Sequence, residues 1–282
     1  PWPRHRGPRL ERAIVVAFAL VWLPARGARD VWAPDEPRFA QVAEELRAGY
    51  AGPRGLVLLH LGGEAYSQKP PLYYWVAAGL GAPFGRVHEW AARLPSAAAG
   101  LAGLALAMAL ARRLFDEKGD RAAPWVGVLL GTSFLWAHHA QRASLDVALA
   151  ACELAAVLAW VRVRRGEIAP ARGFAGIHAA LGLGMLLKGP VALLPLAVLA
   201  LDGRGAVKGL FAPRWLALSL GPFALWGAAV LAIAPEGFFE VAVVENLLGR
   251  FFAGVSHARP VWYYAEHLPT NFLPATLWIP AA

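Results

Sequence analysis

The chain has 282 residues, of which 58% are hydrophobic and 16% charged, and a formal net charge of +8. Soluble domains are about 45–50% apolar and about 25% charged, so this composition and a mean hydropathy of +0.46 argue against a soluble protein. Repeated apolar runs instead predict an all-α, polytopic integral membrane protein. Most Lys and Arg residues lie between those runs, a pattern typical of membrane topology, so we expect no nucleic-acid partner.

The apolar runs predict about seven to eight transmembrane helices, the last beginning near residue 272. Because residue 1 is not Met and the last residues begin an apolar stretch, we expect residues 1–282 to be the N-terminal transmembrane region of a longer protein. The complete runs are near residues 13–27, 95–112, 124–141, 147–162, 173–189, 190–203 and 215–234.

Residues 71–86 decide the topology, because they are apolar but also rich in Tyr and Trp. If they stay outside the bilayer, the Arg-rich segments share one side, and the short loops opposite contain only Arg142 and Lys188 as cations. Cation-rich short loops mark the cytoplasmic side, so we predict a cytoplasmic N-terminus and place 71–86 flat on the outer surface. The Arg-rich segments are the N-terminus and residues 112–121, 162–172 and 204–214.

This topology leaves two long outer segments, which we call the first outer segment (28–94) and the second outer segment (235–271). The first contains Asp35-Glu36-Pro37-Arg38, followed by a predicted helix from Pro37 to Arg47. An acid before a proline is a common helix N-cap, and a carboxylate at the membrane surface also suits a general base. Both interpretations of Asp35 and Glu36 remain open at this point.

The same segment continues with Tyr66-Ser67-Gln68-Lys69-Pro70-Pro71. The two prolines fix an extended backbone and so hold Lys69 in a defined direction at the interface. Lys69 then either extends toward lipid headgroups or binds a phosphate. Arg38 lies one helical turn beyond Asp35 and is a candidate for the same anion.

Several polar residues lie near the predicted helix ends on the outer side. Arg142 and Asp146 flank a turn between two spans and form either an ion pair or part of a site. His138 and His139 lie one turn earlier, but with no partners at ligand spacing we expect no metal. Cations at membrane depth commonly face a cavity, which favours a site role for Lys188.

The second outer segment contributes Glu245-Asn246, Arg250 and Trp262-Tyr263-Tyr264. Aromatic rings stack on sugars and also anchor proteins at membrane interfaces, so Trp262 and Tyr263 fit either role. We expect Glu245 or Arg250 to share one cavity with Asp35 and Lys69.

The sequence has no phosphate-binding Walker loop, no dinucleotide-binding glycine motif and no zinc-protease motif. It also has no Asp-x-Asp motif, so metal-dependent use of a nucleotide sugar is not indicated. Its one cysteine, Cys152, excludes an intramolecular disulfide. We therefore expect no cofactor.

The order of these motifs resembles the N-terminal membrane region of the aminoarabinose transferase-like and protein O-mannosyltransferase families, which are glycosyltransferases of the GT-C fold. The resemblance extends over most of the chain. The matching motifs are Asp35-Glu36-x-Arg38-x-Ala40, Lys69-Pro70-Pro71-Leu72 with Tyr74-Trp75, Arg93-Leu94-Pro95-Ser96, Arg142-x-x-x-Asp146, Lys188-Gly189-Pro190, Glu245-Asn246 with Arg250, and Pro260-x-Trp262-Tyr263-Tyr264.

The resemblance implies a glycosyltransferase of the bacterial cytoplasmic membrane that is active on its outer face. It would move a sugar from a polyprenyl-phosphate donor to a lipid, glycan or protein acceptor. By this resemblance the catalytic candidates are Asp35 and Glu36. The candidates for the donor phosphate are Arg38, Lys69, Lys188 and Arg250, and those for substrate binding are Tyr66, Arg142, Asp146, Glu245 and Tyr263.

Two residues depart from the aminoarabinose transferase pattern. Gln68 stands where those enzymes typically have an acid, and Phe39 where they often have Tyr, so the sugar is left open. A transporter of polyprenol-linked sugars or lipids is the alternative function, since the same cations would hold a headgroup. Transporters commonly contain repeats and matched broken helices, and the sequence shows neither.

Overall fold

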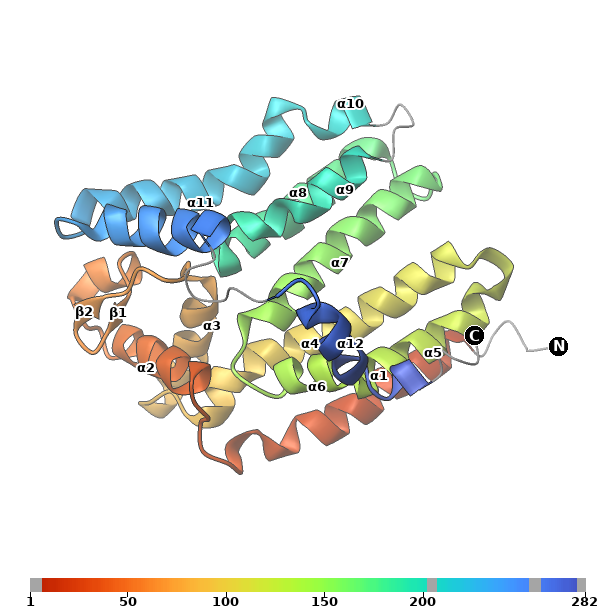
Figure 1. Ribbon diagram of the computed structural model, residues 1–282, viewed down its shortest axis with the longest axis horizontal. Coiled ribbons are helices and arrows are strands. Elements are labelled where there is room, and N and C mark those ends of the chain that lie inside the picture. The colour runs from red at the N-terminus through yellow and green to blue at the C-terminus, as the bar shows by residue number, and fades with distance from the viewer. Residues whose placement is uncertain (1–6, 202–206, 254–259, 278–282) are drawn as a thin grey trace.

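The computed structural model describes residues 7–201, 207–253 and 260–277, and these residues are almost entirely helical (Figure 1). The predicted all-α class is confirmed, with one antiparallel hairpin between β1 (His60–Leu61) and β2 (Glu64–Ala65). The α-helices are α1 (Gly7–Trp22), α2 (Asp35–Arg47), α3 (Leu72–Gly81), α4 (Glu89–Leu114), α5 (Gly119–Thr132), α6 (Phe134–Ala140), α7 (Leu145–Arg164), α8 (Pro170–Lys188), α9 (Leu194–Ala200), α10 (Val207–Leu210), α11 (Pro213–Ile233) and α12 (Tyr263–Asn271). The remaining helical segments are the 3-10 turns η1 (Pro24–Gly27), η2 (Gly52–Leu56), η3 (Ala82–Phe84), η4 (Asp116–Lys118) and η5 (Pro190–Leu193), and the π-helical η6 (Glu240–Ala253).

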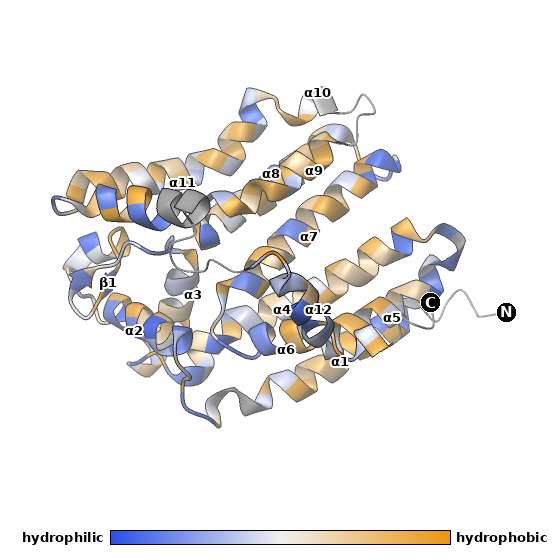
Figure 2. Cartoon of the chain, in the orientation of Figure 1, coloured by the Kyte–Doolittle hydropathy of each residue, from blue (hydrophilic) through white to orange (hydrophobic). Residues whose placement is uncertain are grey.

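The long helices lie side by side in the order α5, α4, α7, α8 and α11, and α1 packs on α4 and α5. Small residues permit this close packing. A Cβ atom added at Gly182 in α8 would lie 2.9 Å from the backbone oxygen of Leu218 in α11. Close backbone approach at small residues is typical of helices packed in a membrane. Apolar residues run along the helices, and polar residues gather at their ends and on α2 (Figure 2).

Two of the described helices, α4 and α11, are long and apolar enough to cross a bilayer. A third span is obtained if α6 and α7, which meet at an angle of 110°, are counted as one broken span. The larger number of spans expected from the sequence therefore stays a prediction. The run that begins near residue 272 forms turns up to Leu277, and its remainder lies outside the described residues.

Two predicted spans are not single helices. The run 124–141 divides into α5 and α6 at Ser133, whose backbone is extended and whose hydroxyl accepts a hydrogen bond from the backbone N–H of Trp136. A serine in this position starts a new helix instead of continuing the old one. The run 190–203 follows Gly189, which has a positive φ of 81°, and divides into η5 and α9, with Pro190 and Pro195 at their first turns.

The Arg-rich turns that were predicted to share one side are in direct contact at one end of the bundle. Arg113 in α4 pairs with Glu167 at 2.9 Å, and Arg165 pairs with Asp116 at 2.9 Å. These pairs join the α4–α5 turn to the α7–α8 turn, as the predicted topology requires. Arg112 also pairs with Glu11 of α1, which brings the start of α1 to the same end.

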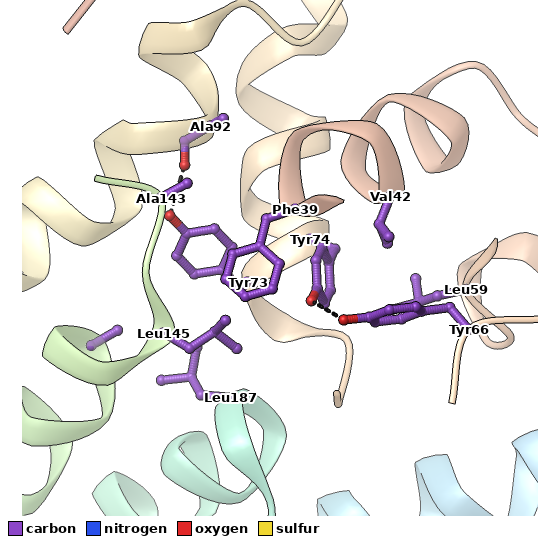
Figure 3. Close-up of a cluster of buried hydrophobic side chains, with 11 residues drawn as sticks. Phe39, Val42, Leu59, Tyr66, Tyr73, Tyr74, Ala92, Ala143, Leu145 and Leu187 are labelled. Atoms are coloured by element: carbon purple, nitrogen blue, oxygen red, sulfur yellow. Dashed lines mark hydrogen bonds between the residues drawn. The ribbon is translucent and has the colours of Figure 1, made fainter. Parts of the chain in front are cut away.

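The first outer segment lies at the opposite end of the bundle, where α2, the β-hairpin and α3 form one unit (Figure 1). At 10 residues α3 is too short to span a bilayer, in agreement with a surface position for residues 71–86. The side chains of Phe39, Tyr73 and Tyr74 pack edge to face or tilted, with ring centroids 5.8–6.2 Å apart. Figure 3 shows this buried cluster, to which Leu145 of α7 and Leu187 of α8 also contribute. The cluster fixes α2 and α3 onto the bundle.

Candidate active site

Glu36 anchors the first outer segment to the bundle through a buried ion pair. Its side chain and that of Arg93 in α4 are almost fully buried, with Glu36 1% and Arg93 0% exposed. Arg93 Nε lies 2.9 Å from Glu36 Oε1, and Arg29 Nη1 lies 2.9 Å from Oε2. The backbone N–H groups of Trp32 and Ala143 each donate to the same carboxylate at 2.9 Å. Because both carboxylate oxygens accept several hydrogen bonds, Glu36 is held as an anion.

The electrostatics of Glu36 follow from these contacts. Burial alone would raise the pKa of this carboxyl, but the hydrogen bonds from Arg93, Trp32, Ala143 and Arg29 outweigh it and lower the pKa from 4.5 to about 2. A carboxylate with so low a pKa is a weak base. The geometry therefore favours a structural role for Glu36 over the catalytic role expected from the sequence.

Asp35, the neighbouring acid, has a different environment. The capping interpretation was wrong, because Pro34 occupies the N-cap position and Asp35 is the first residue of α2. Its carboxylate is 56% exposed and pairs with Arg38 on the next turn. Arg38 in turn donates from Nη1 to Gln68 Oε1 at 2.8 Å. This chain of contacts joins the exposed acid to the segment that contains Lys69.

Lys188, at the end of α8, pairs with Asp146 at the start of α7. Ser144 donates its hydroxyl to Asp146 at 3.3 Å and shares a hydrogen bond of 2.7 Å with His139 Nδ1. The ion pair considered for Arg142 and Asp146 is absent from the described residues, since the Arg142 guanidinium lies over the ring of Trp32 at 5.2 Å. Within the described ranges, no three His, Cys, Asp or Glu side chains are grouped to hold a metal ion.

A cavity of about 260 Å³ separates the first outer segment from α11 and the start of η6. Its polar lining residues include Gln68, Lys69, Lys188 and Asn246. Its apolar lining residues include Phe223, Trp226, Val230, Phe238 and Phe239. A cavity lined by two cations together with aromatic and aliphatic side chains suits an amphiphilic anion.

Two hydrogen bonds join the walls of this cavity across long stretches of sequence. Asn246 in η6 donates from Nδ2 to Ser67 Oγ at 3.2 Å, and Trp226 in α11 donates from Nε1 to the Val57 carbonyl at 2.9 Å. Tyr66 also lines the cavity, and its hydroxyl lies 3.1 Å from that of buried Tyr74 (Figure 3).

The structure brings together only some of the residues predicted to form the site. Lys69, Lys188 and Tyr66 line one cavity, whereas Asp35 lies beside it and connects to it through Arg38 and Gln68. The second outer segment contributes Asn246 to the lining, but not Glu245, which is exposed. Tyr263 in α12 stacks on His267 at 4.0 Å, in a helix that packs near α6 away from this cavity. The side chain of Arg250 lies outside the described residues.

Sequence reasoning missed the importance of Arg29 and did not assign a role to Arg93. A signal for Arg93 was present, because an arginine inside an Ala-rich run near the outer membrane face needs an acidic partner. Arg29 lies in an irregular segment, and its pairing with Glu36 has no local sequence pattern.

Comparison with known proteins identifies the family to which the chain belongs. Residues 68–237, which include Gln68, Lys69 and Lys188, match the family described as dolichyl-phosphate-mannose-protein mannosyltransferase. The chain belongs to this family. The resemblance expected from the motif order is thus confirmed.

Two curated proteins are similar to the chain over 95% of its length. The chain is 31% identical over 95% of its length to undecaprenyl phosphate-alpha-4-amino-4-deoxy-L-arabinose arabinosyl transferase 1 of Pseudomonas fluorescens (strain Pf0-1). It is 30% identical, again over 95%, to the transferase of the same description from Pseudomonas aeruginosa (strain LESB58). It covers 47% and 49% of these relatives, so the chain spans about half the length of the curated relatives it matches.

Solved structures of ArnT from Cupriavidus metallidurans share the fold. The structure bound to undecaprenyl phosphate matches with a TM-score of 0.81 and 25% identity, over 96% of this chain and 50% of that one. The apo structure matches with a TM-score of 0.75 and 27% identity, over 95% and 49%. The arrangement of the helices is therefore similar to that of the matched half of this ArnT.

Proposed function

We propose that the chain carries the donor site of a membrane glycosyltransferase, which moves a sugar from a polyprenyl-phosphate donor to a lipid, glycan or protein acceptor. The observation that carries this proposal is the cavity lined by Lys69 and Lys188 together with many apolar side chains. A polyprenyl-phosphate sugar has the matching parts, an anionic phosphate and a long hydrocarbon chain. The similar Cupriavidus protein was crystallised with undecaprenyl phosphate, which supports the same ligand class here.

The donor phosphate would bind beside Lys69 and Lys188. These two lysines line the cavity from segments far apart in the sequence, and the contact with Asp146 holds Lys188 in position. Charge-assisted hydrogen bonds from cations that are already in place stabilise the phosphate as it departs. Arg38 supports this site indirectly, through its hydrogen bond to the cavity residue Gln68. Arg250 stays a candidate for the same phosphate.

Asp35 is the proposed general base. The acceptor hydroxyl attacks the anomeric carbon of the sugar while the bond from that carbon to the phosphate oxygen breaks. Asp35 takes the hydroxyl proton, and the polyprenyl phosphate leaves with the electron pair. Asp35 is the more exposed of the two adjacent acids and can meet an acceptor, whereas Glu36 holds α2 in place.

We also propose the topology that this chemistry requires. The first outer segment and the cavity lie at the outer face of the bacterial cytoplasmic membrane, and the Arg-rich turns at the other end face the cytoplasm. This places the N-terminus in the cytoplasm. The sugar is then transferred outside the cell membrane from a donor whose lipid chain remains in the bilayer.

Transfer can be tested with membranes from a strain that overproduces the protein, incubated with a panel of labelled undecaprenyl-phosphate sugars. We expect label to move from at least one donor into a membrane acceptor and undecaprenyl phosphate to be released. Membranes that contain the same amount of the Lys69→Ala variant serve as the matched control. Label that crosses the membrane while still attached to its lipid, with no transfer, would instead establish the transporter alternative.

A further inference from the structure

Gln68 lies between the acid-bearing helix α2 and the donor cavity. Its side-chain oxygen accepts the hydrogen bond from Arg38 Nη1 at 2.8 Å, and the same residue lines the cavity. A guanidinium can only donate, so the oxygen of this amide must face Arg38. The amide orientation is therefore fixed by the chemistry of its partner.

This orientation leaves the Gln68 amide nitrogen as a hydrogen-bond donor at the cavity. No acceptor for it is present among the described residues, and it is not enclosed away from solvent. A ligand in the cavity therefore meets an N–H₂ group at this position. Such a group binds an acceptor, for example a hydroxyl or acyl oxygen, and gives no favourable contact to an ammonium group.

Three acids near the site are already paired. Asp35 pairs with Arg38, Asp146 pairs with Lys188, and Glu36 pairs with Arg93 and Arg29. No Asp or Glu lines the cavity within the part of the chain that the structure describes. A cationic sugar in the cavity would therefore lie near two lysines and would find no carboxylate counterion in the lining.

We propose that Gln68 is a specificity-determining residue, and that the sugar transferred at this site is neutral and accepts a hydrogen bond from the Gln68 amide. This deepens the proposed function and rests on it, since the ligand is the sugar of the same polyprenyl-phosphate donor. Two observations predict that amino sugars are rejected: the Gln68 amide nitrogen offers a hydrogen-bond donor to the ligand, and the nearby acids are already paired.

The test uses pairs of undecaprenyl-phosphate donors that differ only in one group, arabinose against 4-amino-4-deoxyarabinose and glucose against glucosamine. Two readouts are compared: transfer of label into membrane acceptors, and displacement of undecaprenyl phosphate from the purified protein. We expect the neutral member to be preferred by about tenfold or more in at least one pair, because an unmatched polar or charged group in a built site is strongly rejected. Gln68→Glu keeps an oxygen for Arg38 but adds a negative charge, so it should reduce that preference by about tenfold.

Arg86→Gln is the matched control, because it makes the same change in net charge at an exposed position outside the cavity. It should leave the ratio between the two donors unchanged. Gln68→Ala should lower use of the neutral donor without improving use of the amino donor. Binding and transfer with equal or greater preference for amino sugars, or a ratio unaffected by Gln68→Glu in a folded protein, would overturn the inference and leave the transferase intact. Failure of every donor to bind or react would overturn the proposed function itself, and the inference with it.

Discussion

Replacing Glu36 by Gln should destabilise the protein more than any other single loss of charge in the first outer segment. The change keeps the shape of the side chain but leaves Arg93, which is 0% exposed, without its counterion. Removing one partner of a buried ion pair typically costs about 3–5 kcal/mol. The lowered pKa points in the same direction, since a shift from 4.5 to about 2 corresponds to roughly 3–4 kcal/mol in favour of the charged carboxylate at about 1.4 kcal/mol per unit.

The pKa of Glu36 also predicts how this loss depends on pH. Because the folded-state pKa lies below the ordinary value of 4.5, the unfolded chain binds the proton more readily. The stabilisation is fully present above about pH 4.5 and is lost as the pH falls toward 2. The wild-type protein and the Glu36→Gln variant should therefore differ most at neutral pH and converge as the solution is acidified.

The measurement is the free energy of unfolding in mixed micelles, followed by tryptophan fluorescence during a denaturing-detergent titration at several pH values. Glu64→Gln is the matched control, because Glu64 is exposed on β2 in the same segment and should change stability by less than about 0.5 kcal/mol. A loss below about 1 kcal/mol for Glu36→Gln, or a difference that persists unchanged at low pH, would refute the assigned role of this ion pair.

Other substitutions test the chemistry and the topology. Asp35→Asn should reduce transfer by about 10²–10⁴-fold without loss of folding, and normal turnover would exclude it as the base. Lys69→Ala should weaken donor use by about tenfold or more, measured as kcat/KM for the donor, whereas exposed Arg86→Ala should change it less than about twofold, and equal effects would contradict a phosphate contact. In a cysteine-free background, Tyr50→Cys should react with an impermeant thiol reagent added outside the cell and Lys118→Cys should not. Labelling of Lys118→Cys but not of Tyr50→Cys would contradict the proposed topology.

The fold was predictable where the physical signal is local. Apolar runs located the long helices, and the helix predicted from Pro37 to Arg47 is present as α2, which buries Phe39, Val42 and Ala43. The short length of α3 agrees with the interfacial placement, which was inferred from the distribution of cations. The break between the runs at Gly189 was predicted, but the break at Ser133 was not, since an apolar run has the same composition whether or not one residue in it leaves the helical conformation.

The site was predictable as a set of residues but not as a geometry. Lys69, Lys188 and the neighbourhood of Glu245 were singled out, and topology placed them on one face. Which of them line the cavity depends on packing between α8, α11 and η6, and no sequence pattern sets that packing. The cavity therefore contains Asn246 where Glu245 was expected.

Asp35 and Glu36 show why residue type alone did not separate chemistry from structure. The two acids are adjacent in the first turn of α2, and consecutive residues of a helix point about 100° apart. That rotation turns Glu36 toward Arg93 and the bundle and leaves Asp35 at the surface beside Arg38. The hydrogen bonds to Glu36 outweigh the effect of burial on its pKa and make it a weak base, and the same contacts fix the helix that presents Asp35. Glu36 therefore fixes α2 against the bundle, and α2 in turn positions Asp35, the proposed base, at the surface.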